Sequence, residues 1–124
     1  MKIDIMEERI FDLEDRLVRF AGEMVFYVKT LPSTDVGKHY ANQVMRSSGS
    51  SALNYGEAQG TTTEKDFVHK MSLVLKELKE SQVILKILEY VKIGDEEKRD
   101  KLLKESKELA AISAKMILNK KKSK

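Results

Sequence analysis

Residues 63–92 read TEKDFVHKMSLVLKELKESQVILKILEYVK, and this stretch decides the fold of the chain. Its apolar side chains recur at steps of three and four, which places them on one face of an α-helix. Thr63, followed three residues later by Asp66 and then by Phe67, is typical of a capping box that starts a helix. We therefore predict a long helix from about Thr63 to Lys92. Its main apolar face consists of Phe67, Met71, Val74, Leu78, Ser81, Leu85 and Leu88.

The second half of this helix is apolar beyond its main face. Val83, Ile84, Ile87 and Val91 project onto other sides of the helix. A helix that is apolar nearly all round is usually buried on several sides. One bundle of this size has a single core, so we expect another subunit to cover part of this surface. These four residues are therefore candidate interface residues.

A helix with similar spacing is predicted on each side of this segment. The first covers residues 5–31 and stops before Pro32, because proline disfavours helix at the preceding residue. The last starts after Gly94 and runs to about Leu118, with Asp95 as a suitable N-cap. The first helix carries the apolar seam Ile10, Leu13, Leu17, Phe20, Met24, Tyr27 and Leu31. The last carries Leu102, Leu109 and Met116 in one stripe, and Leu103, Ala110 and Ile117 in another.

The segment between Pro32 and Gly60 is the hardest to assign. Ser33, Thr34 and Asp35 are candidate N-caps, and the apolar residues that follow can share one broad face. Residues 47–51, however, read Ser-Ser-Gly-Ser-Ser, a composition that favours a loop on propensity. The alternative is one continuous helix whose small residues let a neighbouring backbone approach closely. The local pattern leaves both alternatives open.

The predicted elements define the fold class. Short connections between long helices favour antiparallel neighbours, so we expect an all-α protein, an antiparallel up-down-up-down four-helix bundle. The 124 residues fit one domain. We place the bundle at residues 1–118 and a basic, disordered tail at residues 119–124.

The charge of the chain is concentrated in that tail. The net charge is +3, from 23 basic and 20 acidic residues. Without Lys120, Lys121, Lys122 and Lys124, 19 basic residues face 20 acidic ones, so the body is near neutral. The body therefore offers no basic surface for nucleic acid, whereas the four lysines could add salt-sensitive affinity for RNA.

Several classes of function lack support in the sequence. Cysteine is absent, which excludes disulfides and thiolate chemistry, and no apolar run resembles a signal peptide or a membrane span. A di-iron bundle needs two Glu-x-x-His pairs, but Asp66-x-x-His69 is the nearest match and His69 projects away from the seam. Glu77 and Glu80 lie among lysines and are interpreted as a solvated, salt-bridging face. We expect a cytoplasmic protein that is not an enzyme, with no cofactor, metal or small-molecule substrate.

Residues 43–58 read QVMRSSGSSALNYGEA and are the most distinctive stretch. Together with Thr63, the pair Asp66-Phe67, Lys70 and residues 78–81, they resemble the bacterial four helix bundle protein family. Members of that family are encoded in intervening sequences of large-subunit ribosomal RNA genes, and some carry a ribosomal-protein label. The likeness covers nearly the whole chain. It implies a four-helix bundle with the serine run inside the second helix, and assembly as a ring-like homopentamer.

The accessory proteins of diversity-generating retroelements are distantly similar to this family. They bind a reverse transcriptase and nucleic acid through a strongly basic surface, from which the neutral body of this chain departs. The resemblance implies no established activity. The leading hypothesis is a non-enzymatic, oligomeric helical scaffold that binds a macromolecular partner. The alternative is an RNA-binding or nucleic-acid-binding accessory protein that acts through an oligomer with basic tails.

Three polar residues of the distinctive stretch are candidate site residues. Asn54 and Glu57 are three positions apart, so they lie close together on one helical surface. Arg46 lies two turns before Asn54 on nearly the same face, where it could reach a carboxylate of a neighbouring helix or subunit. These residues form either a recognition site or a hydrogen-bond network that fixes helix register.

Overall fold

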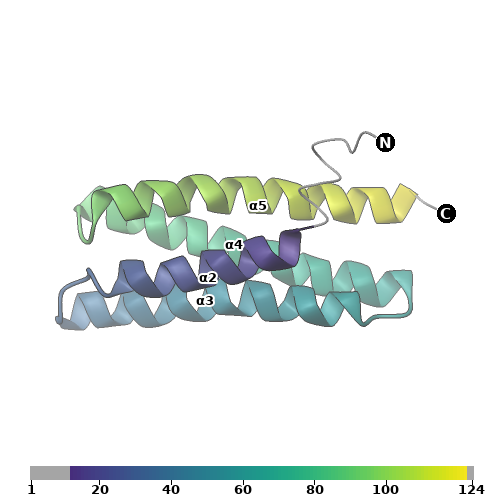
Figure 1. Ribbon diagram of the computed structural model, residues 1–124, viewed down its shortest axis with the longest axis horizontal. Coiled ribbons are helices and arrows are strands. Elements are labelled where there is room, and N and C mark those ends of the chain that lie inside the picture. Colours follow the sequence, from purple (N-terminus) through teal and green to yellow (C-terminus); the bar gives the residue numbers. More distant parts are fainter. Residues whose placement is uncertain (1–11, 123–124) are drawn as a thin grey trace.

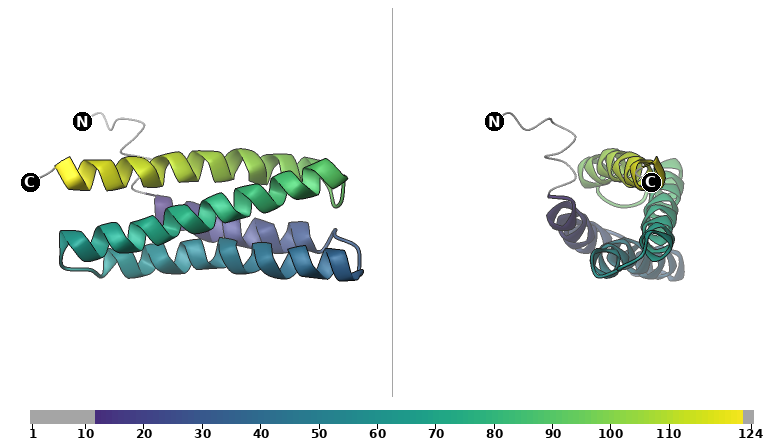
Figure 2. Two further views of the ribbon diagram at one scale, coloured as in Figure 1. Left: turned by 180° about the vertical axis from the view of Figure 1, so that it is seen from behind. Right: turned by 90° about the vertical axis from the view of Figure 1, so that its right-hand side faces the viewer.

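A computed structural model describes residues 12–122, which form four α-helices and no strands (Figure 1). Successive helices run antiparallel, as predicted. In the end view of Figure 2 they follow one another around the bundle, so that α2 and α4 lie diagonally opposite each other. Within this part of the chain, none of the helices is both long and apolar enough to cross a bilayer. The helices are α2 (Leu13–Val28), α3 (Asp35–Gln59), α4 (Glu64–Val91) and α5 (Glu96–Lys122).

Side-chain caps define the starts of three helices. The hydroxyl of Thr34 accepts a hydrogen bond from the backbone N–H of Gly37, at 3.1 Å. Thr63 accepts one from the N–H of Asp66 at 3.1 Å, which confirms the predicted cap of α4. Asp95 accepts one from the N–H of Lys98 at 2.9 Å and caps α5 in the same way. Each cap satisfies an N–H group that has no partner within the helix.

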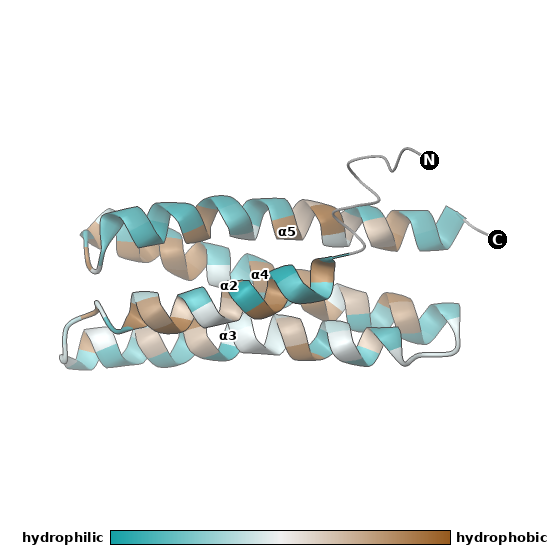
Figure 3. Ribbon diagram, in the orientation of Figure 1, coloured by the Kyte–Doolittle hydropathy of each residue, from teal (hydrophilic) through white to brown (hydrophobic). Residues whose placement is uncertain are grey.

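The predicted seams form the core. The seam of α2 is buried throughout its described part, whereas Ile10 lies outside the described residues. On α4 every seam residue is buried except Phe67, which is half-buried. Figure 3 shows the outer side of α5 as mainly hydrophilic, in keeping with a helix that buries one side. The largest fully buried side chains are Tyr27, Phe20, Leu13, Leu17, Met24, Met71, Leu78, Leu85, Leu88, Leu109, Ile112 and Val44.

The serine run lies inside α3, which settles the open alternative in favour of the continuous helix. Ser47, Ser48 and Ser51 are buried, and each hydroxyl donates to the carbonyl three residues earlier. The Oγ atoms of Ser47 and Ser81 are 2.7 Å apart, so α3 and α4 meet through two of the smallest polar side chains. The serines thus satisfy their own hydroxyls while letting the two helices approach closely.

The two ends of the chain differ from the sequence prediction. The predicted start of the first helix, at Ile5, lies outside the described residues. At the other end, α5 continues to Lys122, so the disorder expected from residue 119 onwards is wrong for residues 119–122. Lysines in the last turn interact favourably with the negative end of a helix, and Lys120 Nζ lies 5.2 Å from the centre of the Phe67 ring. Lys124 lies outside the described residues.

Candidate interaction surfaces

The second half of α4 presents apolar side chains to solvent. We call Val83, Ile87, Tyr90 and Val91 the α4 face; their exposed fractions range from 37 % to 88 %. The expectation of an uncovered surface therefore holds for three of the four residues named from the sequence. It is wrong for Ile84, which is buried in the protomer. Ile84 lies three residues after Ser81 and four before Leu88, so it shares their inward side of the helix.

A second apolar surface lies on α2, and the sequence interpretation missed it. Val18, Val25 and Phe26 are between 41 % and 56 % exposed. Gly22 lies among them, and a Cβ atom added to it would meet no atom of the described residues within 4 Å. We call these four residues the α2 face. The signal was present in the sequence, because Val18 and Val25 are seven positions apart and lie off the main seam.

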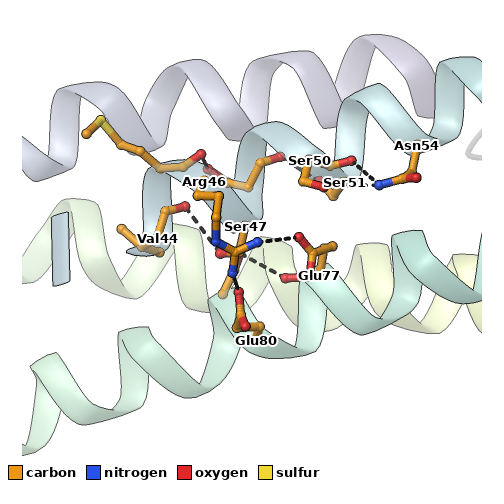
Figure 4. Close-up of polar contacts among 11 residues, drawn as sticks. Val44, Arg46, Ser47, Ser50, Ser51, Asn54, Glu77 and Glu80 are labelled. Atoms are coloured by element: carbon orange, nitrogen blue, oxygen red, sulfur yellow. Dashed lines mark hydrogen bonds and ion pairs between the residues drawn. The ribbon is translucent and has the colours of Figure 1, made fainter. Parts of the chain in front are cut away.

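Arg46 projects from α3 towards two carboxylates of α4 (Figure 4). Its Nη1 donates to Glu77 Oε2 at 2.9 Å, and its Nη2 pairs with Glu80. Arg46 therefore reaches a neighbouring helix of the same protomer, one of the two predicted alternatives. Glu77 is buried, so its interpretation as a solvated residue is wrong: it lies four residues before Ser81, on the side of α4 that meets α3.

Asn54 and Glu57 form no joint site with Arg46. Asn54 Nδ2 donates to the Ser50 carbonyl at 2.9 Å and to its hydroxyl at 3.0 Å, both within α3. Glu57 pairs with Lys70 of α4 at 2.7 Å. The three polar residues thus make separate contacts, and those of Arg46 and Glu57 hold α3 against α4 in one register.

Polar contacts attach α2 to α5 and to the turn that precedes it. Arg16 Nη2 lies 2.7 Å from Glu105 Oε1, and this hydrogen bond raises the pKa of the guanidinium. At the other end of α2, Tyr27 Oη donates to the Ile93 carbonyl at 3.0 Å, and Arg99 Nη1 donates to the same oxygen at 3.0 Å. Burial raises the pKa of the Tyr27 hydroxyl, while the nearby Arg99 acts in the opposite direction.

The bundle end at which α5 finishes carries a cluster of lysines. Lys120, Lys121 and Lys122 occupy the last turn of α5, and Lys120 packs over Phe67 near the start of α4. Asp66 is exposed there and serves the cap of α4 through its backbone. Across residues 12–122, no group of three or more His, Cys, Asp or Glu side chains is placed to hold a metal ion.

Known proteins similar to this chain share its four-helix architecture. The family model described as 23S rRNA-intervening sequence protein matches residues 12–115. The chain belongs to this family. A crystal structure from Bacteroides thetaiotaomicron, described as a protein with unknown function from the S23 ribosomal protein family, is 25 % identical with a TM-score of 0.78. The match covers 85 % of this chain and 97 % of that one. No curated protein matches the sequence. The resemblance seen in residues 43–58 is therefore confirmed.

Proposed function

We propose that this intervening-sequence protein is a non-enzymatic, oligomeric helical scaffold that binds a macromolecular partner. The family resemblance implies a ring of five copies. Partners of the assembled ring would be RNA or a nucleic-acid-processing protein, in keeping with the ribosomal RNA context of the family name. The observation that carries the proposal is the α4 face, whose apolar side chains are exposed in the protomer.

An exposed cluster of this kind favours association. Burial of apolar surface contributes roughly 25 cal/mol per Å², and apolar patches on monomeric proteins are usually small. Tyr90 is 88 % exposed in the protomer. Tyrosine is a residue type enriched at the centre of protein interfaces. Covering these side chains with another copy removes them from water without any change in the bundle itself.

The polar side chains of the core support a structural and not a catalytic role. The buried serines bond to carbonyls of their own helix or to one another. Glu77 pairs with Arg46, and the Tyr27 hydroxyl donates to a backbone carbonyl. These groups are engaged in holding helices together, which is what a scaffold requires.

Sedimentation velocity of the purified chain at micromolar concentration tests the proposal. We expect a species near five times the 14.2 kDa mass of one chain, with the helical content of the bundle. A well-folded 14.2 kDa monomer across this concentration range would refute the scaffold.

One observation favours RNA binding as a second candidate function. Lys120, Lys121 and Lys122 lie on an ordered helical turn, so an oligomer would present several basic clusters at fixed places. Repeated weak sites raise avidity without new contacts. Fluorescence anisotropy with a labelled single-stranded RNA, at low and moderate salt, should show binding that weakens with salt. A chain that ends at Leu118 should lose this binding; undiminished affinity in the shortened chain would eliminate this candidate.

A further inference from the structure

We infer that the copies associate head to tail, with the α2 face of one copy packed against the α4 face of the next. This inference rests on the proposed self-association and adds which two surfaces meet. Its basis is the placement of the two faces on the protomer, their sizes and the charges beside them.

The two faces lie on opposite sides of the bundle. Helices α2 and α4 lie diagonally opposite each other (Figure 2), and the side chains of both faces are exposed and lie off the buried seams. A two-fold contact through either face alone would leave the other face exposed. A head-to-tail contact uses one face from each copy, so repeating it covers both.

The two faces also lie at the same height. Tyr27 Oη bonds to the carbonyl of Ile93, 66 positions later, and the N–H of Asp95 bonds to Thr30 Oγ1, 65 positions earlier. These bonds align the C-terminal ends of two helices that run in the same direction. The α2 face ends two residues before the end of α2 at Val28, and the α4 face ends with α4 itself at Val91. Each face therefore spans nine residues close to the aligned ends, 18–26 on α2 and 83–91 on α4.

The similar height of the two faces determines whether repeated contacts form a closed ring or an open helix. A rotation about an axis parallel to the bundle, with no shift along it, places the α2 face of one copy beside the α4 face of the next. Head-to-tail contacts close into a ring when the rotation closes, and form an open helix when each step also shifts along the axis. The alignment of the two faces favours the ring.

Gly22 would allow α4 of the next copy to approach α2 closely. A glycine inside a helix costs about 0.5–1 kcal/mol relative to alanine. Among residues 12–122, no atom lies close enough to Gly22 to require the missing side chain. The contact would place large side chains of the α4 face, such as Ile87, opposite a helix surface that has none.

The charges beside the faces are complementary. Asp12 and Glu14 are exposed just before the α2 face, and Lys76 and Lys79 are exposed just before the α4 face. Head-to-tail packing brings these opposite charges together, which favours the correct register. Parallel two-fold packing of α4 on α4 would instead bring lysines towards lysines.

Two single substitutions test the pairing. Phe26→Asp changes the α2 face and Val83→Asp the α4 face; both side chains are more than half exposed, so the protomers should fold. We expect each variant alone to sediment as a monomer. An equimolar mixture should form a species of two chains, because one intact α2 face and one intact α4 face remain. Leu53→Asp on α3, at a site 70 % exposed and outside both faces, is the matched control and should assemble as the unaltered chain does.

A charge exchange provides a second measurement. Glu14→Lys and Lys79→Glu should each raise the concentration at which half of the chains are assembled, by about tenfold. Both changes in one chain should lower that concentration again, because each contact then regains opposite charges.

The outcomes separate the inference from the proposed function. If the unaltered chain stays monomeric, both the head-to-tail pairing and the proposed scaffold are refuted. If the unaltered chain assembles but Phe26→Asp assembles equally well or forms dimers through an intact α4 face, head-to-tail pairing is overturned and the scaffold stands. A mixture of the two variants that remains monomeric, together with no recovery in the charge exchange, also overturns it.

Discussion

Replacement of Ser47 by leucine probes the contact that distinguishes this bundle. Ser47 and Ser81 are fully buried, and their Oγ atoms are 2.7 Å apart where α3 meets α4. A leucine side chain would need the space that the Ser81 hydroxyl occupies. We therefore expect Ser47→Leu to force α3 and α4 apart at this level and to destabilise the bundle.

The magnitude follows from three effects. Overpacking a closed contact costs about 1–3 kcal/mol, and the lost hydrogen bond about 0.5–1.5 kcal/mol. Ser81 still donates to the Glu77 carbonyl at 3.0 Å, so its buried hydroxyl keeps a partner. Leucine is the better helix former by a few tenths of a kcal/mol, which offsets little of the loss. The free energy of unfolding should fall by about 1–4 kcal/mol.

Urea unfolding followed by circular dichroism at 222 nm measures this change, at one protein concentration for all variants because association contributes to stability. Gly49→Ala is the control on the same helix, since a Cβ atom there meets nothing within 4 Å in the part of the chain that the structure describes. It should raise the free energy of unfolding by about 0.5–1 kcal/mol. A Ser47→Leu variant within about 0.5 kcal/mol of the unaltered chain would refute the close contact.

Three further changes test other contacts. Gly37→Ala should destabilise by at least about 1–3 kcal/mol, because its Cβ would lie 1.9 Å from the Pro32 carbonyl oxygen; an unchanged thermal midpoint would contradict this. Arg46→Ala should cost about 1–3 kcal/mol in urea unfolding by leaving buried Glu77 without its partner, and replacing both by methionine should recover part of that loss. Tyr27→Phe should destabilise near neutral pH, but its deficit should shrink as the pH rises above the ordinary tyrosine pKa of 10.0. The raised pKa of folded Tyr27 makes ionisation favour the unfolded chain there, so a deficit that stays constant in alkaline urea titrations would contradict the assignment.

Apolar spacing predicted most of the fold. The seams of α2, α4 and α5, the caps at Thr63 and Asp95, and the antiparallel order follow from local pattern alone. Such features depend on residues within one or two turns of each other, which a sequence displays directly. The continuous α3 did not follow from propensity, because serine and glycine favour loops until a neighbouring helix uses their small size.

For the candidate site residues too, local spacing and contacts between helices carried different information. Exposure of Val83, Ile87 and Val91 followed from an excess of apolar residues, whereas Ile84 packs inward beside the seam residues Ser81 and Leu88. Glu77 appeared solvated among its lysine neighbours in sequence, and its burial appeared only when Arg46 was placed opposite it.

The sequence by itself determined which surfaces of each helix are apolar, because side-chain period is a local property of the backbone. Only the tertiary structure decided that the α2 and α4 faces point outward on opposite sides and at one height. That arrangement depends on contacts between residues some 65 positions apart, such as Tyr27 with Ile93 and Thr30 with Asp95, and a local pattern carries no information about them.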